Sequence, residues 1–226
     1  MNTVAIFDLD GTLISGYAWK GFRRYYFKYK KRKVPLMLLS LMLYLALWPL
    51  AKSPLLDKEK YIVWLMTKMD SVFKGEAREE LEKSSRWVVD SYILGALRQD
   101  IFDIMRWHKE NGHIVVLVSA VFQELLEIMG QELGITYVIG TRLETMNGKY
   151  TGRIVPPFCF GKGKARLLKE FLEQREMKVD LLSSFAYADN ISDVPVMEMV
   201  GNPVAAYPDK ELFRLAGKRG WRIIDG

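Results

Sequence analysis

Residues 1–16 read MNTVAIFDLDGTLISG, and this stretch decides how the rest of the chain is interpreted. Its apolar run, Val4 to Phe7, includes two β-branched residues and is followed closely by Gly11, which is typical of a buried strand in a parallel sheet. Two carboxylates, Asp8 and Asp10, come directly after this strand. Because open α/β sheets bind ligands at the carboxyl ends of their strands, the stretch predicts an α/β fold with both acids at its binding site.

Length and composition set the outer limits of the interpretation. A chain of 226 residues can bury a full core, as one domain or as one domain with a sizeable insertion. Half of the residues are hydrophobic and 27% are charged, a balance that excludes a disordered chain. The single cysteine, Cys159, excludes an internal disulfide framework and a cysteine metal cluster. We therefore expect a reducing, cytoplasmic compartment, and the first residues resemble a strand rather than a secretory signal.

From residue 97 onward, segments with strand and helix patterns alternate. In order, we expect a helix over 98–112, a strand over 113–120, a helix over 122–134, a hairpin over 142–154, a helix over 164–176, strands over 185–189 and 203–207, and a helix over 211–220. The pair Asn147-Gly148 fits the turn of the hairpin. Strands separated by helices of this length imply right-handed crossovers and a mostly parallel sheet.

Residues 15–96 differ in kind from the rest of the chain. They show no convincing strand pattern, and the stretches 57–69 and 75–93 are typical of helices. We therefore predict that an all-helical insertion, residues 15–96, interrupts an α/β core formed by residues 1–14 and 97–226.

Side chains suited to chemistry occur at four places where a strand is expected to end or a helix to begin. They are Asp8-Leu9-Asp10-Gly11-Thr12, Ser119-Ala120, Lys164, and Asp189 with Asp193. Each has a simpler interpretation. The two acids of Asp8-Leu9-Asp10 could form a turn or a sugar-nucleotide metal motif, and Ser119 could simply end a strand. Lys164 could be a solvated helix residue, and Asp189 and Asp193 could cap a turn. Their joint occurrence on the expected elements favours one phosphohydrolase site.

These four motifs, in this order, resemble those of the haloacid dehalogenase (HAD) superfamily, specifically its phosphoserine-phosphatase-like branch with a helical cap after the first motif. The resemblance covers essentially the whole chain. It implies a HAD-like Rossmannoid sheet with helices on both faces, residues 15–96 as the cap, and a phosphatase that acts through an aspartyl-phosphate. It implies that Asp8 is the nucleophile and Asp10 the general acid and base. It implies that the phosphate is bound by Thr12, Ser119, Ala120 and Lys164. It also implies that Mg²⁺ is bound by Asp8, the Asp10 backbone carbonyl, Asp189 and Asp193, the last directly or through water.

Elementary chemistry supports the same assignment. A phosphate monoester is anionic, so an attacking carboxylate needs a cation and fixed donors to cancel the repulsion. The motifs offer hard oxygen ligands and no cluster of thiolates or histidines, a set that favours Mg²⁺. We assign Cys159, His108 and His113 to packing or to the surface, because neither histidine lies near the motifs in the sequence.

The basic residues are concentrated in one segment. Between Gly11 and Leu56 there are nine lysines and arginines and no acid, so the remainder of the chain is net acidic although the whole carries +6. From Val34 to Ala51 only Ser40 and Tyr44 have polar side chains, and eighteen helical residues would span about 27 Å, near the hydrocarbon thickness of a bilayer.

A single membrane crossing by this segment conflicts with the expected topology, because it would separate Asp8 from Ser119, Lys164 and Asp189. We therefore expect an in-plane or shallowly inserted helix, with residues 19–51 on an anionic membrane at the inner face and with Trp19, Tyr25, Tyr26 and Trp48 at interfacial depth. The alternative is a buried helix of the cap. No nucleic-acid partner is expected, because the adjoining apolar helix makes lipid the better match for the basic arm.

The substrate is predicted from the cap. In phosphoserine phosphatases of this branch an acid about nine residues after the nucleophile holds the substrate ammonium, whereas this chain has Tyr17 there, and Ser192 replaces the usual Asn of the last motif. A basic, apolar cap without that acid suits a substrate that carries extra negative charge or an acyl chain. We therefore predict a phospholipid-related or other anionic monoester, such as the phosphatidylglycerophosphate or lysophosphatidate type. The alternatives are soluble phosphoserine, a phosphotransferase reaction, and a non-catalytic membrane-associated scaffold.

Overall fold

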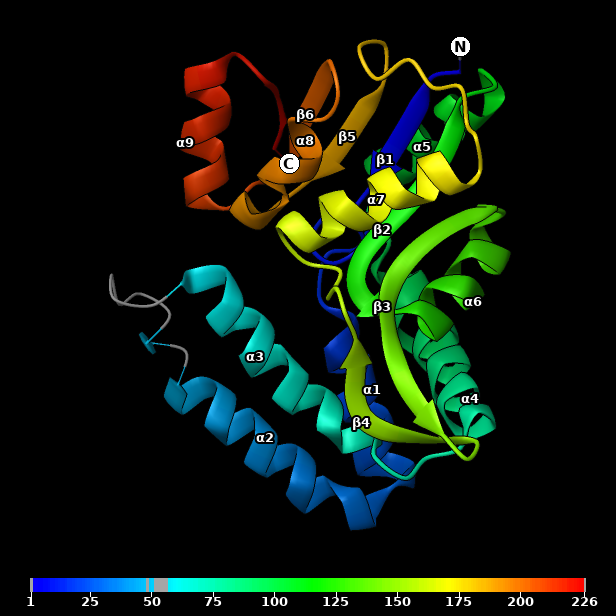
Figure 1. The fold of residues 1–226 in the computed structure, drawn as a ribbon, viewed down its shortest axis with the longest axis vertical. Helices are drawn as coiled ribbons and strands as arrows, with labels where there is room; N and C mark the ends of the chain where they lie inside the picture. Colours follow the sequence, from blue (N-terminus) through cyan, green and yellow to red (C-terminus); the bar gives the residue numbers. More distant parts are fainter. Residues whose placement is uncertain (1, 48, 51–56, 226) are drawn as a thin grey trace.

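The computed structural model describes residues 2–47, 49–50 and 57–225, and its ribbon is drawn in Figure 1. Within these residues seven strands form one sheet in the order β4-β3-β2-β1-β5-β6-β7. The strands are β1 (Val4–Phe7), β2 (Ile114–Phe122), β3 (Tyr137–Met146), β4 (Lys149–Val155), β5 (Phe185–Ala188), β6 (Asn202–Ala206) and β7 (Arg222–Ile224). Strand β4 is antiparallel to β3, and the other neighbouring pairs are parallel. The predicted α/β class and mostly parallel sheet are confirmed.

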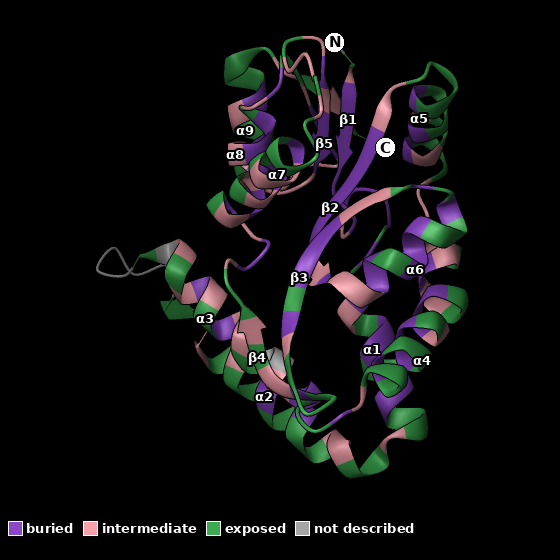
Figure 2. Ribbon diagram, turned by 45° about the vertical axis from the view of Figure 1, so that its right-hand side comes forward, coloured by how far each residue is buried: buried purple, intermediate pink, exposed green. Residues whose placement is uncertain are grey.

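Strand β1 lies at the centre of the sheet and is buried on both faces. Its alternate residues enter different cores: Ala5 and Phe7 belong to one apolar cluster, and Val4 and Ile6 belong to the other. This alternation follows from the two-residue side-chain period of a strand. All four residues of β1 are apolar and buried, and Figure 2 shows the strand in the colour of buried residues.

Helices cover both faces of the sheet. They are α5 (Gln99–Glu110), α6 (Gln123–Leu133), α7 (Lys162–Gln174), α8 (Val194–Met197) and α9 (Lys210–Arg219). The apolar residues of α5 and α6 join the first cluster, and those of α7, α8 and α9 join the second. Each crossover between parallel strands therefore buries one side of a helix against the sheet.

The segment after β1 is helical in its described part. It contains α1 (Ala18–Tyr29), α2 (Val34–Leu47), α3 (Lys58–Asp70) and α4 (Arg78–Val88). The chain leaves and rejoins the sheet domain at adjacent points, where Ile14 bridges Leu97 and the Ser15 N–H donates to the Ala96 carbonyl at 2.8 Å. The division into residues 1–14 with 97–226 and residues 15–96 stays a prediction, and this bridge supports it.

The hairpin of β3 and β4 extends from the sheet to the helical segment. Its turn has Asn147 and Gly148 at φ values of 51° and 73°, as a two-residue hairpin turn requires. Lys149 bridges Ala77 at the start of α4, and the buried Tyr150 donates its hydroxyl to Glu124 of α6 at 2.6 Å. The hairpin was predicted, but β3 begins five residues earlier than expected, at Tyr137, and β7 was missed.

Helix α2 is buried on one side and exposed on the other. It ends at Leu47 in the described chain, and Trp48 and residues 51–56 of the predicted apolar segment lie outside the described residues. Met37 and Ser40 are buried, whereas the opposite side is exposed and apolar. The alternative of a fully buried cap helix is therefore wrong for α2. Among the residues described, no helix is long and apolar enough to cross a membrane.

Candidate active site

Parallel pairing brings three of the four motifs to one edge of the sheet. Phe7 at the end of β1 pairs with Leu117 of β2 and with Tyr187 of β5. The residues that follow these partners therefore lie at the same edge. They line one cavity of about 780 Å³ together with Lys164 of α7: Asp8, Asp10, Ser119, Ala120, Asp189 and Asp193.

Lys164 lies between two buried carboxylates. Its Nζ donates to Asp8 Oδ1 at 2.7 Å and to Asp193 Oδ1 at 2.5 Å, and all three side chains are at most 9% exposed. Burial by itself would lower the pKa of the Lys164 ammonium, but the adjacent Asp193 and Asp8 carboxylates reverse this effect and raise it. The lysine is therefore a fixed positive charge against the first carboxylate of the chain.

Three carboxylates form a cluster that could hold a cation. One oxygen each from Asp8, Asp189 and Asp193 lies within 4.8 Å of the others. Burial raises the pKa values of Asp8 and Asp189; the Lys164 ammonium opposes the rise in Asp8, and the neighbouring carboxylates add to it in Asp189. Hard oxygen donors held together at this separation fit Mg²⁺, whose charge would relieve the mutual repulsion.

Gly11 is required by the close approach of Asp189. Its φ is +84°, and a Cβ at this position would lie 2.1 Å from Asp189 Oδ2. Any side chain here would displace a carboxylate of the cluster as well as strain the backbone. The glycine of the first motif therefore allows the fourth motif to approach the first.

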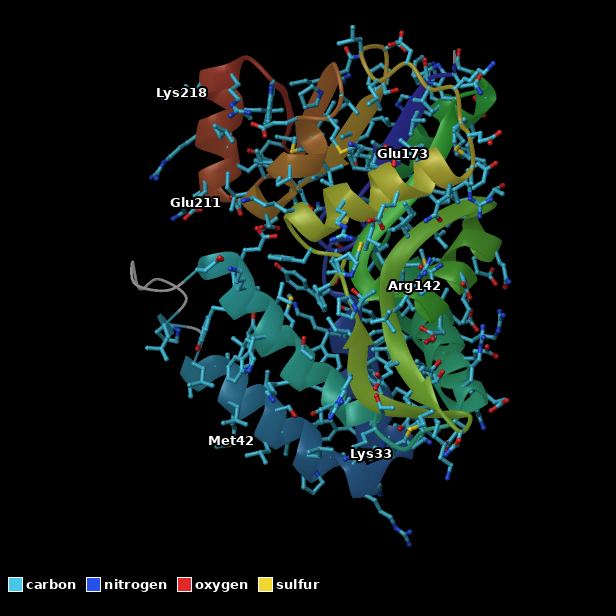
Figure 3. The ribbon with its side chains drawn as sticks, viewed as in Figure 1. Lys33, Met42, Arg142, Glu173, Glu211 and Lys218 are labelled. Carbon is cyan, nitrogen blue, oxygen red and sulfur yellow. The ribbon has the colours of Figure 1, made fainter. Side chains whose placement is uncertain are left out.

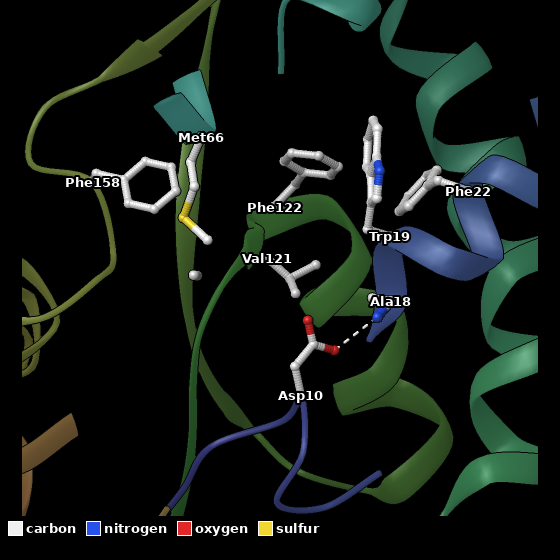
Figure 4. A pocket seen from close by; sticks show the side chains of 9 residues that line it. Asp10, Ala18, Trp19, Phe22, Met66, Val121, Phe122 and Phe158 are labelled. Carbon is white, nitrogen blue, oxygen red and sulfur yellow. Dashed lines mark hydrogen bonds between the residues drawn. The ribbon is translucent and has the colours of Figure 1, made fainter. Parts of the chain in front are cut away.

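Asp10 is held by the first helix of the inserted segment. The Ala18 N–H, at the start of α1, donates to Asp10 Oδ1 at 2.8 Å, the bond that Figure 4 draws as a dashed line. Burial raises the pKa of Asp10 to about 7, although the Ala18 N–H opposes the rise. A carboxyl with such a pKa can exchange a proton near neutral pH.

The comparisons with known proteins agree with this geometry. Residues 5–198 match the haloacid dehalogenase-like hydrolase family. The chain belongs to this family. Its seven-stranded fold and its relatives place this hydrolase in the phosphoserine-phosphatase-like branch, and it is a phosphatase.

Two relatives and two solved structures illustrate the similarity. Phosphoserine phosphatase SerB1 of Mycobacterium tuberculosis is 31% identical over 232 residues, which cover all of this chain and 71% of that protein. The histidinol-phosphatase of Neisseria meningitidis is 28% identical over 66% of this chain and 68% of its own length. A protein of unknown function from Bordetella pertussis matches with a TM-score of 0.82 and 25% identity, covering 100% and 99% of the two chains. A substrate-bound phosphoserine phosphatase matches in fold, with a TM-score of 0.67 and 18% identity over 100% and 94%.

The predicted phosphate-binding residues of this hydrolase differ in their positions. Ser119 and Ala120 line the cavity, and the Ser119 Oγ accepts a long bond of 3.4 Å from the Val121 N–H. Thr12 is fully buried outside the cavity lining, and its hydroxyl donates to Asp189 Oδ1 at 3.4 Å. The predicted contact between Thr12 and phosphate stays a prediction, and in this structure the Thr12 hydroxyl contacts Asp189.

Sequence reasoning missed three acids that line the cavity: Asp209, Glu211 and, in the inserted segment, Glu59. Glu59 lies in the first turn of α3 and lines the cavity, and its Oε1 accepts from the Lys162 N–H at the start of α7 at 2.8 Å. In the described structure none of the basic residues between 20 and 33 lines this cavity, whose lysines are Lys164 and Lys210. Among the described residues of the cap, the charged side chain that lines this cavity is therefore an acid, and the choice of substrate stays a prediction. No local pattern could have revealed Glu59, because its position depends on how α3 meets α7.

The histidines and the cysteine have the packing roles predicted for them. His108 is fully buried between the Tyr187 hydroxyl at 2.8 Å and His113 Nδ1 at 2.7 Å. Burial lowers the pKa of His108 to about 4, and burial raises the pKa of the Cys159 thiol to about 12. Both groups are therefore neutral near pH 7.

Proposed function

We propose that this hydrolase is a Mg²⁺-dependent phosphomonoesterase that forms an aspartyl-phosphate on Asp8. The observation that carries the proposal is the cavity in which Asp8, bound to Lys164, lies with Asp10 and the carboxylates of the fourth motif. Among the described residues, no histidine, cysteine or serine forms a nucleophile–base pair in this cavity. A carboxylate nucleophile is therefore the assignment that this set of residues supports.

The residues divide the reaction into two displacements. In the first, a carboxylate oxygen of Asp8 attacks phosphorus, the bond to the ester oxygen breaks, and Asp10 gives its proton to the departing alkoxide. In the second, Asp10 takes a proton from water, the water oxygen attacks phosphorus, and the Asp8 carboxylate leaves. Lys164 holds Asp8 in place and opposes the charge of the phosphoryl group. Mg²⁺ bound by Asp8, the Asp10 carbonyl, Asp189 and Asp193 would neutralise the phosphoryl oxygens.

A small apolar pocket supports an assignment of the leaving group. It has a volume of about 110 Å³, and Figure 4 shows it between α1, α3 and the end of β2. Asp10 contributes its one charged side chain, and the remaining lining is Ala18, Trp19, Phe22, Met66, Ala120, Val121, Phe122 and Phe158. Since Asp10 must reach the ester oxygen, the first carbons of the alcohol lie next to this pocket. Apolar carbons therefore bind there more favourably than a charged group.

We accordingly propose a phospholipid-related monoester whose alcohol carries an acyl chain. The lysophosphatidate type fits better than a substrate with additional negative charge, because the basic residues between 20 and 33 do not line the cavity. Such a substrate resides in membranes, so we also propose membrane contact within residues 19–51, of which the structure describes all except 48 and 51. Tyr25 and Tyr26, which were expected at interfacial depth, are buried in the helical segment and take no part in this contact. Soluble phosphoserine is the second candidate, favoured by the names of relatives and by the Glu59 carboxylate in the cavity.

Hydrolysis of a chromogenic phosphate tests the chemistry. We expect turnover that requires Mg²⁺ and stops with EDTA, loss of turnover in Asp8→Asn, and normal turnover in Asp90→Asn, a matched change at an exposed residue of the helical segment. Equal activity, or equal inactivity, of the wild type and the Asp8→Asn protein would remove the assignment. Steady release of phosphate without an added alcohol argues against a phosphotransferase.

A substrate panel then tests the leaving group. Lysophosphatidate in mixed micelles is compared with phosphoserine, glycerol phosphate and a sugar phosphate at equal concentration. We expect the highest kcat/KM for the acyl-bearing ester. Turnover of the soluble esters alone would show that the lipid assignment is wrong while leaving the phosphatase chemistry intact.

A further inference from the structure

Helix α2 is packed on one side only. It contacts α3 and lies outside it in Figure 1, and its buried residues are Met37 and Ser40. The side that faces away from the protein is apolar. Its side chains, here named the α2 face, are Leu36, Leu38, Leu39, Met42, Leu43 and Leu45, each between 41% and 66% exposed. Figure 3 shows Met42 projecting away from the rest of the molecule.

The α2 face has no polar side chain to make contact with water favourable. Its helix reads VPLMLLSLMLYLAL, whose two polar residues are Ser40 and Tyr44. Ser40 is buried and donates to the Leu36 carbonyl at 2.9 Å, and Tyr44 lines the main cavity on the packed side. A contiguous apolar surface of this kind on a protein marks a site of contact with another apolar phase.

Unpaired cations lie at the beginning of the same helix. Lys30 and Lys33 are bound to Glu80 and Glu76. By contrast, the exposed Lys28, Lys31 and Arg32 have no acidic partner within the described part of the chain. Phe27 and Tyr29, about half exposed, accompany them. An apolar helix face next to cations and aromatic rings is the pattern of helices that bind anionic membranes in the plane of the interface.

We propose that α2 docks in the interface of an anionic bilayer, with the α2 face in the acyl boundary and Lys28, Lys31 and Arg32 on the headgroups. Fourteen helical residues span about 21 Å, which fits an in-plane position better than a crossing. A second copy of the chain is the weaker occupant. Since no acid occurs between Gly11 and Leu56, self-association through α2 would leave the cations of both copies without partners.

Docking in this orientation has a consequence for the cavity. Tyr44, on the packed side of α2, lines the cavity that contains Asp8. The bilayer surface would therefore lie about one helix diameter, roughly 10 Å, from the cavity wall. An amphiphilic phosphate ester could then reach Asp8 without leaving the interface completely. This last consequence rests on the proposed function, whereas docking itself does not.

Vesicle flotation of the whole chain tests the docking. The wild type is mixed with vesicles of phosphatidylcholine and phosphatidylglycerol (7:3) or of phosphatidylcholine alone, at low salt. We expect binding to the anionic vesicles that decreases in 0.5 M NaCl. Replacement of two cations, Lys31→Gln with Arg32→Gln, should weaken partitioning about thirtyfold. Replacement of two face residues, Leu39→Gln with Met42→Gln, should weaken it at least tenfold.

Two controls separate docking from misfolding and from self-association. Leu182→Gln changes the most exposed of the large apolar residues described, far from α2, and should bind as the wild type does. All variants should hydrolyse the soluble chromogenic phosphate at the wild-type rate, which shows that they are folded. A wild type that stays in the soluble fraction with anionic vesicles at low salt overturns the proposal. A dimer that depends on Leu39 and Met42 and excludes vesicles overturns it in favour of a second copy.

Discussion

Replacing Lys164 with methionine isolates the central electrostatic contact of the site. The change keeps most of the side-chain length and removes a buried cation 2.7 Å from Asp8 and 2.5 Å from Asp193. Breaking a buried pair by removing one partner typically costs about 3–5 kcal/mol, because the remaining charge is left without compensation. For a chain of this size that corresponds to a decrease in Tm of roughly 6–20 °C. The matched control is Lys162→Met, two residues away on the exposed side of α7.

Thermal unfolding in EDTA, and again with excess Mg²⁺, measures the effect. We expect the Lys164→Met protein to be destabilised in EDTA and to recover part of its Tm with Mg²⁺, since a divalent cation supplies charge to the same carboxylates. We also expect kcat to fall about 10²–10³-fold, as for loss of one electrostatic contact to a reacting group. If the two methionine variants have the same Tm in EDTA and the same kcat, the contacts of Lys164 with Asp8 and Asp193 are not those described.

Three further predictions concern single residues. Gly11→Ala should reduce activity by at least tenfold in steady-state assays, because the added Cβ would displace Asp189; unchanged kinetics would contradict this close approach. His108→Gln should flatten the dependence of the free energy of unfolding on pH. Burial holds the pKa of His108 at about 4, below its value in the unfolded chain. The stabilisation that this histidine contributes is therefore fully present above pH 6.5 and decreases as the pH falls toward 4. Urea titrations at pH 7 and pH 4 measure the effect. Between these two pH values the free energy of unfolding of the wild type should decrease by about 2–3 kcal/mol more than that of the variant, provided that the variant keeps a bond to the Tyr187 hydroxyl. If soluble phosphoserine is the substrate, Glu59→Gln should change KM for phosphoserine more than kcat. If kcat/KM instead changes equally for all esters of the panel, Glu59 serves the contact between α3 and α7.

The edge of the sheet that carries the candidate site was predictable from sequence because each motif is attached to a recognisable strand or helix. Asp8 follows a short apolar run that is typical of a buried strand, and Asp189 follows a second such run. Parallel pairing with β1 then places both at one edge without further information. Local pattern and topology were therefore sufficient for the sheet and for the position of the carboxylates.

The contacts that were missed depend on tertiary packing. Glu59 enters the cavity only because α3 meets the beginning of α7, and nothing in its neighbouring residues indicates this contact. Strand β7 has three residues and is recognisable as a strand only by its pairing with β6. Likewise, the uniformly apolar sequence of α2 fits burial on all sides or on one side, so its exposed face could be found only from coordinates.

The position of Asp10 links the inserted helices to the chemistry. The N–H that binds its carboxylate belongs to Ala18, the first residue of α1, so this carboxylate satisfies one of the donors that a helix leaves unpaired at its beginning. Any movement of α1 relative to the sheet must therefore lengthen this bond or move Asp10. Ala18 also lines the small apolar pocket, so a leaving group bound there contacts the same turn of helix that positions the carboxyl group. If Asp10 gives its proton to the leaving alcohol, as proposed, binding of the alcohol and orientation of its proton donor are coupled through one turn of α1. This coupling is a physical reason for an insertion directly after the first strand.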